Sequence, residues 1–333
     1  MIPLTLGTLL ASILVIIISL LAILLLTPLT IRILKSKGIL VQDFHKPNKP
    51  LVPKPGGPAI MMSLIIGESL AYLFTGNLGI IALILVTAIS GVIGLLDDAY
   101  TLSGVMKPVS LLIASLPILV LGTFSAHPEF PIFGAVRLTL IYPLLVLIAI
   151  PITANTVNTI DVLNGVVSGF ITIAAIPIIF ALALKGNTDM FLAALPILAV
   201  SFGFYIFHKF PSRIFPGDSG SLSLGAIYGA IAIVGGVEII GIIAILPAIL
   251  NSFFFLSSVK RLVEHRKLKE RPTIVLGENR LAASRSVSAP LTLVRLILAD
   301  GPLTEKEITL NILKLTIYSA FLAIITASMT WLK

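Results

Sequence analysis

Long apolar stretches make up most of the chain, and short polar segments separate them. A stretch of about 17–25 apolar residues is long enough to cross the hydrocarbon core of a membrane as a helix. Ten segments meet this criterion, centred on residues 4–27, 58–75, 78–96, 108–126, 138–156, 166–184, 190–207, 221–236, 239–258 and 308–331. The pattern therefore predicts an all-α, polytopic membrane protein with about ten transmembrane helices.

The composition supports this prediction, because 57% of the residues are hydrophobic and only 11% are charged. Average soluble domains are about 25% charged. No change in composition marks a separate soluble domain, so we expect residues 1–333 to form one integral-membrane domain. The largest polar segment, 260–306, is too short for much of a core of its own. The first apolar stretch is too long for a cleaved signal peptide, so we expect it to remain as a span.

The basic residues indicate the orientation of the spans. All but three of the 23 Lys and Arg residues lie in or beside segments 32–54, 97–107, 208–220 and 260–306, the exceptions being Arg137, Lys185 and Lys333. Because basic loops stay in the cytoplasm, these four segments are predicted to be cytoplasmic and both termini external. The net charge of +8 fits this orientation signal, contact with anionic lipid, or a phosphorylated substrate.

Four aspartates, Asp97, Asp98, Asp161 and Asp218, lie at the predicted cytoplasmic ends of spans. Carboxylates at one membrane depth are costly and indicate a site for a cation or a cation-bound substrate. Adjacent helical positions point about 100° apart, so Asp97 and Asp98 either have separate roles or one of them is idle. Cysteine is absent, which excludes disulfides and thiolate metal sites.

A series of polar residues follows the fifth apolar stretch. The segment "NTVNTIDVLNG", residues 155–165, places Asn155, Asn158, Asp161 and Asn164 three residues apart. In an α-helix these steps sweep around half the circumference. The series therefore predicts a helix that tightens or unwinds, with a turn at Asn-Gly. The alternative is a polar helix end that satisfies its own carbonyl groups.

Small residues surround Asp218 in "FPGDSGSLSLGA", residues 215–226. Such a helix start leaves backbone N–H groups facing an incoming anion, and a carboxylate is a hard oxygen ligand that suits Mg²⁺. The alternative is that Asp218 is a simple N-cap.

Two further segments are basic. "HKPNKPLVPKPGGP", residues 45–58, is typical of a stiff connector, although its lysines are suited to phosphate contacts. "KRLVEHRKLKERP", residues 260–272, is typical of a solvated, lipid-attracted loop.

Taken in order, "DDAYTLSGVMK" (97–107), "NTVNTIDVLNG" (155–165) and "FPGDSGSLSLG" (215–225) resemble segments of the polyprenyl-phosphate N-acetylhexosamine-1-phosphate transferases. The resemblance covers nearly the whole chain. The segment "LTLVRLILADGPLTEKEITLNIL" looks more like the eukaryotic and archaeal dolichyl-phosphate GlcNAc-1-phosphate branch than the bacterial peptidoglycan enzymes.

This resemblance implies transfer of a sugar 1-phosphate, with GlcNAc-1-phosphate as the expected group, from a UDP-sugar to a polyprenyl or dolichyl phosphate. UMP is released, and the reaction begins lipid-linked oligosaccharide assembly. It further implies a Mg²⁺ cofactor, with Mn²⁺ as a substitute, and an active site on the cytoplasmic face of the cell membrane. Magnesium commonly takes one or two protein oxygens and fills its remaining positions with phosphate and water, which suits this chemistry.

The resemblance also implies roles for individual residues. Expected roles are Mg²⁺ ligation by Asn158 and Asp218, uridine contact by Asn164 and Phe215, lipid-phosphate contact by Lys107, and sugar recognition by His265 and Arg266 in a cytoplasmic loop spanning 260–306. Two departures affect the sugar contacts. Glu264 precedes His265 where eukaryotic relatives have a basic residue, and Lys54 aligns with an acid.

Asp97, Asp98, Lys107 and Asp161 form the expected catalytic set, and Asn155 is an expected substrate contact. We assign Asp98 to orienting the lipid phosphate or relaying its residual proton, and Asp97 to a contact with Lys107 or the metal. The two roles are interchangeable at this point. Since the attacking phosphate has a second pKa of about 6, a strong general base is unnecessary.

Three alternatives remain open from the sequence. The same chemistry on another UDP-sugar, such as UDP-MurNAc-pentapeptide or UDP-GalNAc, fits the same motifs. A secondary transporter predicts charges near span centres and repeat symmetry, and neither is seen. An intramembrane aspartyl protease leaves the asparagine series unexplained. Membrane lipid is an expected partner and nucleic acid is not, and the oligomeric state is open, with a homodimer as one candidate.

Overall fold

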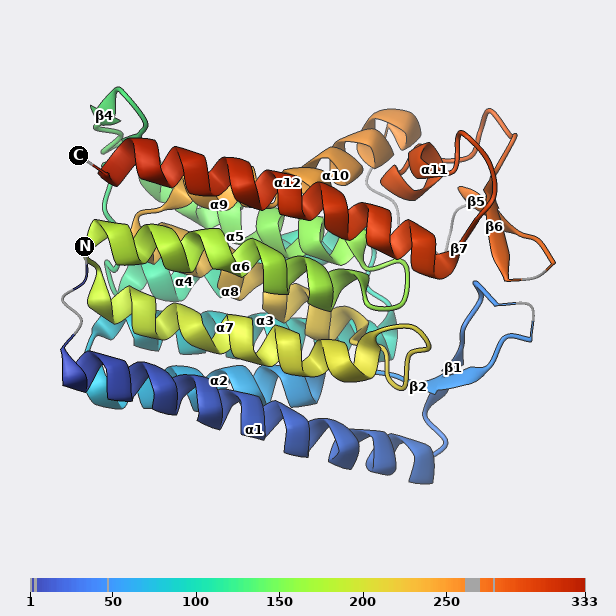
Figure 1. The fold of residues 1–333 in the computed structure, drawn as a ribbon, viewed down its shortest axis with the longest axis horizontal. Helices are drawn as coiled ribbons and strands as arrows, with labels where there is room; N and C mark the ends of the chain where they lie inside the picture. The colour runs from blue at the N-terminus through green and yellow to red at the C-terminus, as the bar shows by residue number, and fades with distance from the viewer. Residues whose placement is uncertain (1, 3–4, 47, 261–269, 278, 333) are drawn as a thin grey trace.

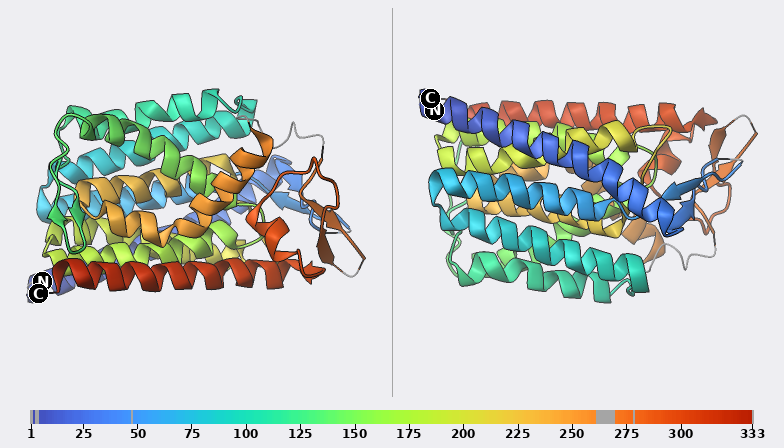
Figure 2. Two further views of the ribbon diagram at one scale, coloured as in Figure 1. Left: turned by 90° about the horizontal axis from the view of Figure 1, so that it is seen from above. Right: turned by 90° about the horizontal axis from the view of Figure 1, so that it is seen from below.

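A computed structural model describes the chain except for residues 1, 3–4, 47, 261–269, 278 and 333. Long helices lie side by side along one axis (Figure 1). Both termini lie at one end of this bundle, here called the terminal end. The opposite end carries strands β1, β2, β5, β6 and β7 and is called the cavity end (Figure 2).

Within the part of the chain that the structure describes, eight helices are long and apolar enough to cross a membrane. They are α1 (Leu6–Ser36), α2 (Gly57–Thr75), α3 (Leu78–Tyr100), α5 (Tyr142–Ile160), α6 (Val166–Lys185), α7 (Thr188–His208), α8 (Gly217–Gly235) and α12 (Glu305–Trp331). Each coincides with one of the ten predicted segments, which confirms the all-α membrane architecture.

The other two predicted segments differ from straight spans. Segment 239–258 consists of α9 (Glu238–Ala244) and α10 (Leu246–Val259), which meet at an angle of 68° and form a ninth span only if they are taken together. Pro247 in the first turn of α10 explains the break, since proline lacks an N–H donor and clashes with the preceding turn. Segment 108–126 contains α4 (Met106–Val120), a shorter apolar helix of 15 residues.

Helix α8 forms the centre of the bundle, with 94% of its apolar window buried. It packs against α3 and α5, and small residues allow a close approach. A Cβ atom added to Gly94 of α3 would lie 2.4 Å from the Cα atom of Ser219. The close packing places the first turn of α8 directly beside the last turns of α3.

Short strands cap the two ends of the bundle. At the cavity end, β1 (Leu40–Gln42) pairs antiparallel with β2 (Leu51–Pro53). There too β5 (Thr273–Val275), β6 (Arg280–Ala283) and β7 (Leu303–Thr304) form an antiparallel sheet. The short helix α11 (Leu293–Ile297) lies between β6 and β7 in the chain. At the terminal end, β3 (Glu129–Phe130) pairs with β4 (Gly134–Ala135).

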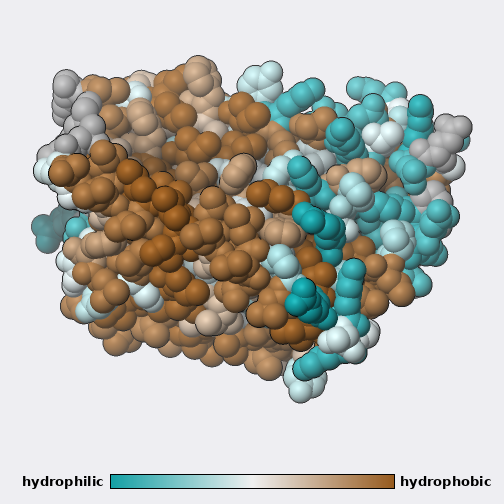
Figure 3. All heavy atoms as spheres, turned by 60° about the horizontal axis from the view of Figure 1, so that its bottom comes forward, coloured by the Kyte–Doolittle hydropathy of each residue, from teal (hydrophilic) through white to brown (hydrophobic). Residues whose placement is uncertain are grey.

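The surface is divided in the same way. Figure 3 shows hydrophobic residues over the side of the helical bundle and hydrophilic residues gathered toward the cavity end. The predicted basic segments 32–54, 97–107, 208–220 and 260–306 approach this end, as far as their described residues show. The expected separation of basic and apolar segments is therefore present in the fold.

Candidate active site

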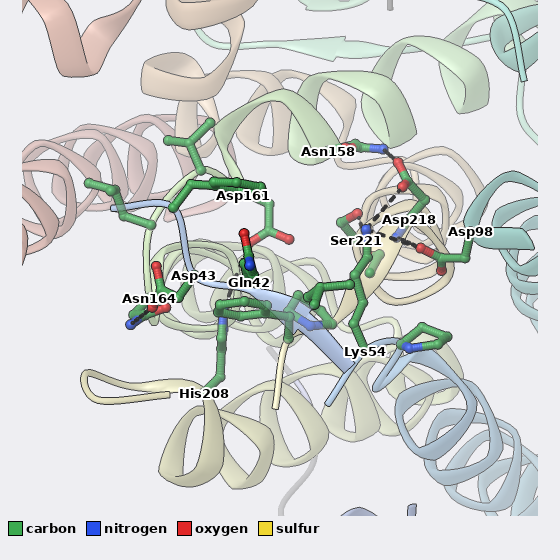
Figure 4. A pocket seen from close by; sticks show the side chains of 18 of the residues that line it. Gln42, Asp43, Lys54, Asp98, Asn158, Asp161, Asn164, His208, Asp218 and Ser221 are labelled. Atoms are coloured by element: carbon green, nitrogen blue, oxygen red, sulfur yellow. Dashed lines mark hydrogen bonds and ion pairs between the residues drawn. The ribbon is translucent and has the colours of Figure 1, made fainter. Parts of the chain in front are cut away.

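A cavity of about 760 Å³ opens at the cavity end of the bundle. Its walls come from the β1–β2 hairpin, the end of α3, the turn between α5 and α6, and the start of α8. Its polar lining residues are Gln42, Asp43, His45, Lys54, Asp98, Asn158, Asp161, Asn164, His208, Asp218 and Ser221 (Figure 4). The cavity thus brings together the three motif segments that the sequence separates.

Asp218, in the first turn of α8, is the most shared of these side chains. Its Oδ1 accepts hydrogen bonds from Lys107 Nζ at 2.6 Å and from Asn158 Nδ2 at 2.8 Å. Its Oδ2 lies 3.6 Å from Lys54 Nζ. One carboxylate is therefore contacted from α4, α5 and the segment after β2, which makes it a junction of the site.

The adjacent acids Asp97 and Asp98 point to different partners, as predicted. Asp97 is buried, with Oδ2 2.5 Å from Lys107 Nζ and Oδ1 accepting from the Leu102 N–H at 2.6 Å. Asp98 instead accepts from the backbone N–H groups of Asp218 at 3.0 Å and Ser219 at 2.9 Å. The expected Asp97–Lys107 contact is present, while both oxygens of Asp98 cap the N-terminus of α8.

This cap corrects two expectations about the start of α8. The prediction that its free N–H groups receive a substrate anion is wrong for Asp218 and Ser219, because the Asp98 carboxylate already occupies them. The alternative that Asp218 is the N-cap is also wrong, since α8 begins at Gly217 and Pro216 occupies its N-cap position. A helix N-terminus favours a negative charge, and α3 supplies it. The approach requires glycine at 217, where φ is +74° and an added Cβ would lie 2.7 Å from Asp98 Oδ2.

The asparagine series unwinds only at its end. Helix α5 continues to Ile160, and the chain then turns through Asp161 to Gly165, where φ is +85°. Asn158 and Asn164 line the cavity. Asn155 does not, and its Nδ2 donates to the Pro151 carbonyl at 2.8 Å. The structure therefore gives no support to the expected substrate contact of Asn155. Its side chain instead satisfies a carbonyl group of its own helix, as the alternative of a polar helix end predicts.

Asp161 lies on the cavity wall beside His208. Asp161 Oδ1 is 4.0 Å from His208 Nε2, and the Nδ1 atom of that ring is 2.9 Å from Ser168 Oγ. Burial raises the pKa of Asp161 to about 8; the positive charge of Lys54 opposes the shift and the charges of Asp218 and Asp98 add to it. The group is therefore suited to holding a proton near neutral pH.

Other predicted residues occupy distinct places. Phe215 lines the cavity, and its backbone is fixed by hydrogen bonds with Pro53 and Gly56. Lys107 is not a lining residue and lies behind Asp218, whereas Lys54 lines the cavity. His265 and Arg266 lie outside the described residues, so their sugar contacts stay predictions.

Sequence reasoning missed several lining residues, among them Gln42, Asp43, His45, His208 and Ser221. Most of these belong to the β1–β2 hairpin, which the proline-rich pattern indicated only as a connector. The available signal was that His45 belongs to the basic segment 45–58 and that Asp43 lies just before it. Ser221 lies within the Asp218 motif, and His208 precedes that motif by seven positions.

The donor set around Asp218 fits a magnesium ion. Among the described residues, no group of three or more His, Asp or Glu side chains is arranged to hold a metal. Mg²⁺ does not require such a group, because it commonly uses one or two protein oxygens together with phosphate and water. The Asp218 carboxylate and the Asn158 side-chain amide, in contact beside the cavity, are oxygen ligands of this kind.

Comparisons with known proteins agree with this geometry. Residues 80–236 match the model of "Glycosyl transferase family 4". A Methanocaldococcus jannaschii protein named as a glycosyltransferase is 30% identical over 80% of this chain and 80% of its own length. A Sulfolobus acidocaldarius protein, named as a UDP-N-acetylglucosamine–dolichyl-phosphate N-acetylglucosaminephosphotransferase, is 26% identical over 91% and 92%. The phospho-N-acetylmuramoyl-pentapeptide-transferase of Frankia alni is 28% identical over 77% and 85%.

Proposed function

Because this chain belongs to glycosyl transferase family 4, we propose that it transfers GlcNAc-1-phosphate from UDP-GlcNAc to a polyprenyl phosphate and releases UMP. The observation that carries the proposal is the contact of Asp218 with Asn158 and Lys107 beside the cavity. Two oxygen ligands and a cation at one point suit a pyrophosphate with its metal. The name of the Sulfolobus relative supports the choice of GlcNAc and of an isoprenoid acceptor.

We assign Mg²⁺ to Asp218 and Asn158, where the ion would neutralise charge on the transferring pyrophosphate. Lys54 faces the cavity and balances the remaining negative charge. Lys107 holds Asp218 from behind and links it to Asp97. Asp98 fixes the first turn of α8, and with it the position of Asp218. These residues position and neutralise, which is the main requirement of phosphoryl transfer.

The acceptor is itself a phosphate and is mostly dianionic at neutral pH. An oxygen of this phosphate attacks the β-phosphorus of the UDP-sugar, and the bond between that phosphorus and the bridging oxygen breaks, so UMP leaves. One phosphoanhydride is broken and one is made. We therefore expect an equilibrium constant near unity and ready reversal.

The test uses radiolabelled UMP with the purified chain, Mg²⁺ and UDP-GlcNAc in lipid. Label should enter UDP-GlcNAc when polyprenyl phosphate is present. Exchange in the absence of polyprenyl phosphate would indicate a covalent sugar-phosphate on a carboxylate and would contradict direct attack. No exchange across several UDP-sugars, in a sample that still binds UMP, would refute the transferase itself.

The name of the Frankia relative makes transfer of phospho-MurNAc-pentapeptide the second candidate. The same exchange assay discriminates the two. Faster exchange into UDP-MurNAc-pentapeptide than into UDP-GlcNAc would replace the proposed sugar and leave the chemistry intact.

We further propose that the cavity end faces the cytoplasm, where UDP-sugars are made. The basic segments gathered at this end support the orientation. Val287 and Phe133 are 100% and 84% exposed and lie in loops of the cavity end and the terminal end, respectively. In this cysteine-free chain, Val287→Cys should react with an impermeant thiol reagent only from the cytoplasm and Phe133→Cys only from outside. The reverse pattern would invert the orientation.

A further inference from the structure

Asn164 is held by two other segments of the chain through three of its own polar groups. Its backbone N–H donates to Glu305 Oε1 at 2.8 Å, and its carbonyl accepts from Thr309 Oγ1 at 3.3 Å. Its side-chain Nδ2 donates to Asp43 Oδ2 at 3.2 Å. Asn164, Asp43 and Glu305 are each at most 3% exposed. The residue is fixed from α12 on one side and from the β1–β2 hairpin on the other.

The contact with Asp43 decides which way the amide faces. A carboxylate only accepts hydrogen bonds when ionised, so it selects the Nδ2 end of the amide and not Oδ1. Asp43 is itself held by Lys46, whose Nζ lies 2.5 Å from Oδ2. Asn164 and Asp43 both line the cavity (Figure 4). Within the described part of the chain, no hydrogen bond reaches Oδ1 of Asn164. The oxygen is therefore the end of the amide left for a ligand.

We propose that Asp43 is a positioning residue that selects uracil over cytosine by fixing the orientation of the Asn164 amide. The inference rests on the proposed function, in which the substrate is a uridine nucleotide, and it places the base at Asn164 and Phe215, which both line the cavity. In Figure 4, Asn164 and Asp43 lie on the opposite side of the cavity from Asp98 and Asp218. A nucleotide with its pyrophosphate at Asp218 therefore has its base directed toward Asn164.

The chemistry of the two bases explains the selection. Uracil carries a hydrogen-bond donor at N3, whereas N3 of cytosine is an acceptor. An oxygen fixed opposite N3 pairs with uracil and leaves two acceptors facing each other with cytosine. An amide that is free to turn would present its N–H₂ end and accommodate cytosine. A site built around a buried hydrogen bond discriminates against the base that cannot make it.

The experiment measures binding of UMP and CMP to the full chain by titration calorimetry, in the presence of Mg²⁺. Asp43→Asn places an amide that can pair with either end of Asn164. We expect the preference for UMP over CMP to fall by about tenfold, the value of one buried hydrogen bond. Thr309→Val also removes one hydrogen bond to Asn164 but leaves the side-chain amide in place, so it should keep the preference.

The exchanged pair, Asp43→Asn with Asn164→Asp, supplies the rescue. Its amide donates to the carboxylate, which again presents an oxygen to the base, so the UMP preference should return. If Asp43→Asn does not fold, the exchanged pair alone decides. Equal losses for UMP and CMP in Asp43→Asn, or no recovery in the exchanged pair, would show that Asp43 only holds the hairpin in place. Wild-type exchange of UMP would then still support the transferase. Absence of that exchange together with absence of UMP binding would refute both.

Discussion

Both ends of the helical bundle carry ion pairs between lysines and acids, and the two clusters differ in how their charges are shared. At the terminal end, Lys185 Nζ lies 2.9 Å from Glu129 Oε1 and donates to the Gly236 carbonyl at 2.8 Å. Trp331 Nε1 donates to the other oxygen of Glu129 at 2.8 Å. This cluster joins β3 with the ends of α6, α8 and α12, and its Lys185–Glu129 ion pair joins one cation to one anion.

At the cavity end, among the described residues, the three carboxylates of Asp97, Asp98 and Asp218 share the two ammonium groups of Lys54 and Lys107. Asp98, Asp218 and Lys54 line a cavity of about 760 Å³. An ion pair of one cation with one anion ties elements together, whereas a carboxylate shared by several partners at a cavity is suited to the electrostatics of an active site. This sharing at a cavity, more than the mere presence of charge, distinguishes the candidate active site.

Asp218→Asn should have the largest effect on transfer. This change removes the negative charge of the carboxylate that Lys107, Asn158 and Lys54 share, without opening a space in the bundle. We expect transfer to fall at least a hundredfold, as for loss of a metal ligand or a key electrostatic group. The assay is transfer of radiolabelled GlcNAc-1-phosphate over a Mg²⁺ titration.

The protein should stay monodisperse in detergent, and size-exclusion chromatography provides this control. Near-normal transfer by Asp218→Asn at any Mg²⁺ concentration would show that the active site does not lie at the acid cluster.

Lys54→Met should have the next largest effect. Lys54 lies 3.3 Å from Asp98 and 3.6 Å from Asp218 and is 23% exposed, so part of its charge is screened by solvent. We expect about a tenfold loss of transfer, smaller than for Asp218. Lys49→Met is the matched control, because Lys49 is on the same hairpin and contacts the Phe44 ring. Equal losses in both variants would mean that the hairpin supplies only general positive charge.

The fold and the candidate site differ in how far the sequence predicts them. Hydropathy located every long helix, because burial in lipid requires long apolar stretches regardless of neighbours. The motifs also predicted that Asp218 and Asn158 act together. Neither signal predicted that Asp98 caps α8, since that contact joins residues 120 positions apart. Such partners depend on helix packing, here on the close approach of α3 and α8 at Gly94.

Local signals were weaker still for the β1–β2 hairpin. Its proline and lysine content indicated a connector, yet Asp43 and Lys54 line the cavity. Pro247 was a local signal for the bend between α9 and α10, but the hydropathy of residues 239–258 taken as one apolar segment does not show it. A hydropathy pattern reports depth in the membrane and not which side chains meet.

The third prediction concerns Asp161, whose pKa burial raises to about 8. An ordinary aspartate titrates near pH 4, so between pH 4 and 8 the folded state binds the extra proton. Stability from this group is therefore present at low pH and is lost as pH rises through 8. When a chelator removes divalent metal, the melting temperature of the wild type should fall more steeply with rising pH between pH 5 and 8 than that of Asp161→Asn. Parallel curves would show that Asp161 is ionised in the fold.

The smallest effect is expected at the terminal end, from Lys185→Met. Lys185 and Glu129 are 25% and 30% exposed, so their attraction is screened and contributes about 1 kcal/mol or less. The melting temperature should fall by at most about 2–4 °C, as measured in detergent. Transfer should remain within twofold of wild type, because the pair lies at the end of the bundle opposite the cavity. Lys107→Met is the matched variant, since it removes the lysine that bridges Asp97 and Asp218, and it should reduce transfer far more than Lys185→Met. If Lys185→Met lowers transfer as much as Lys107→Met, the two clusters are coupled through the bundle, and the sharing of charges does not separate the structural end from the chemical one.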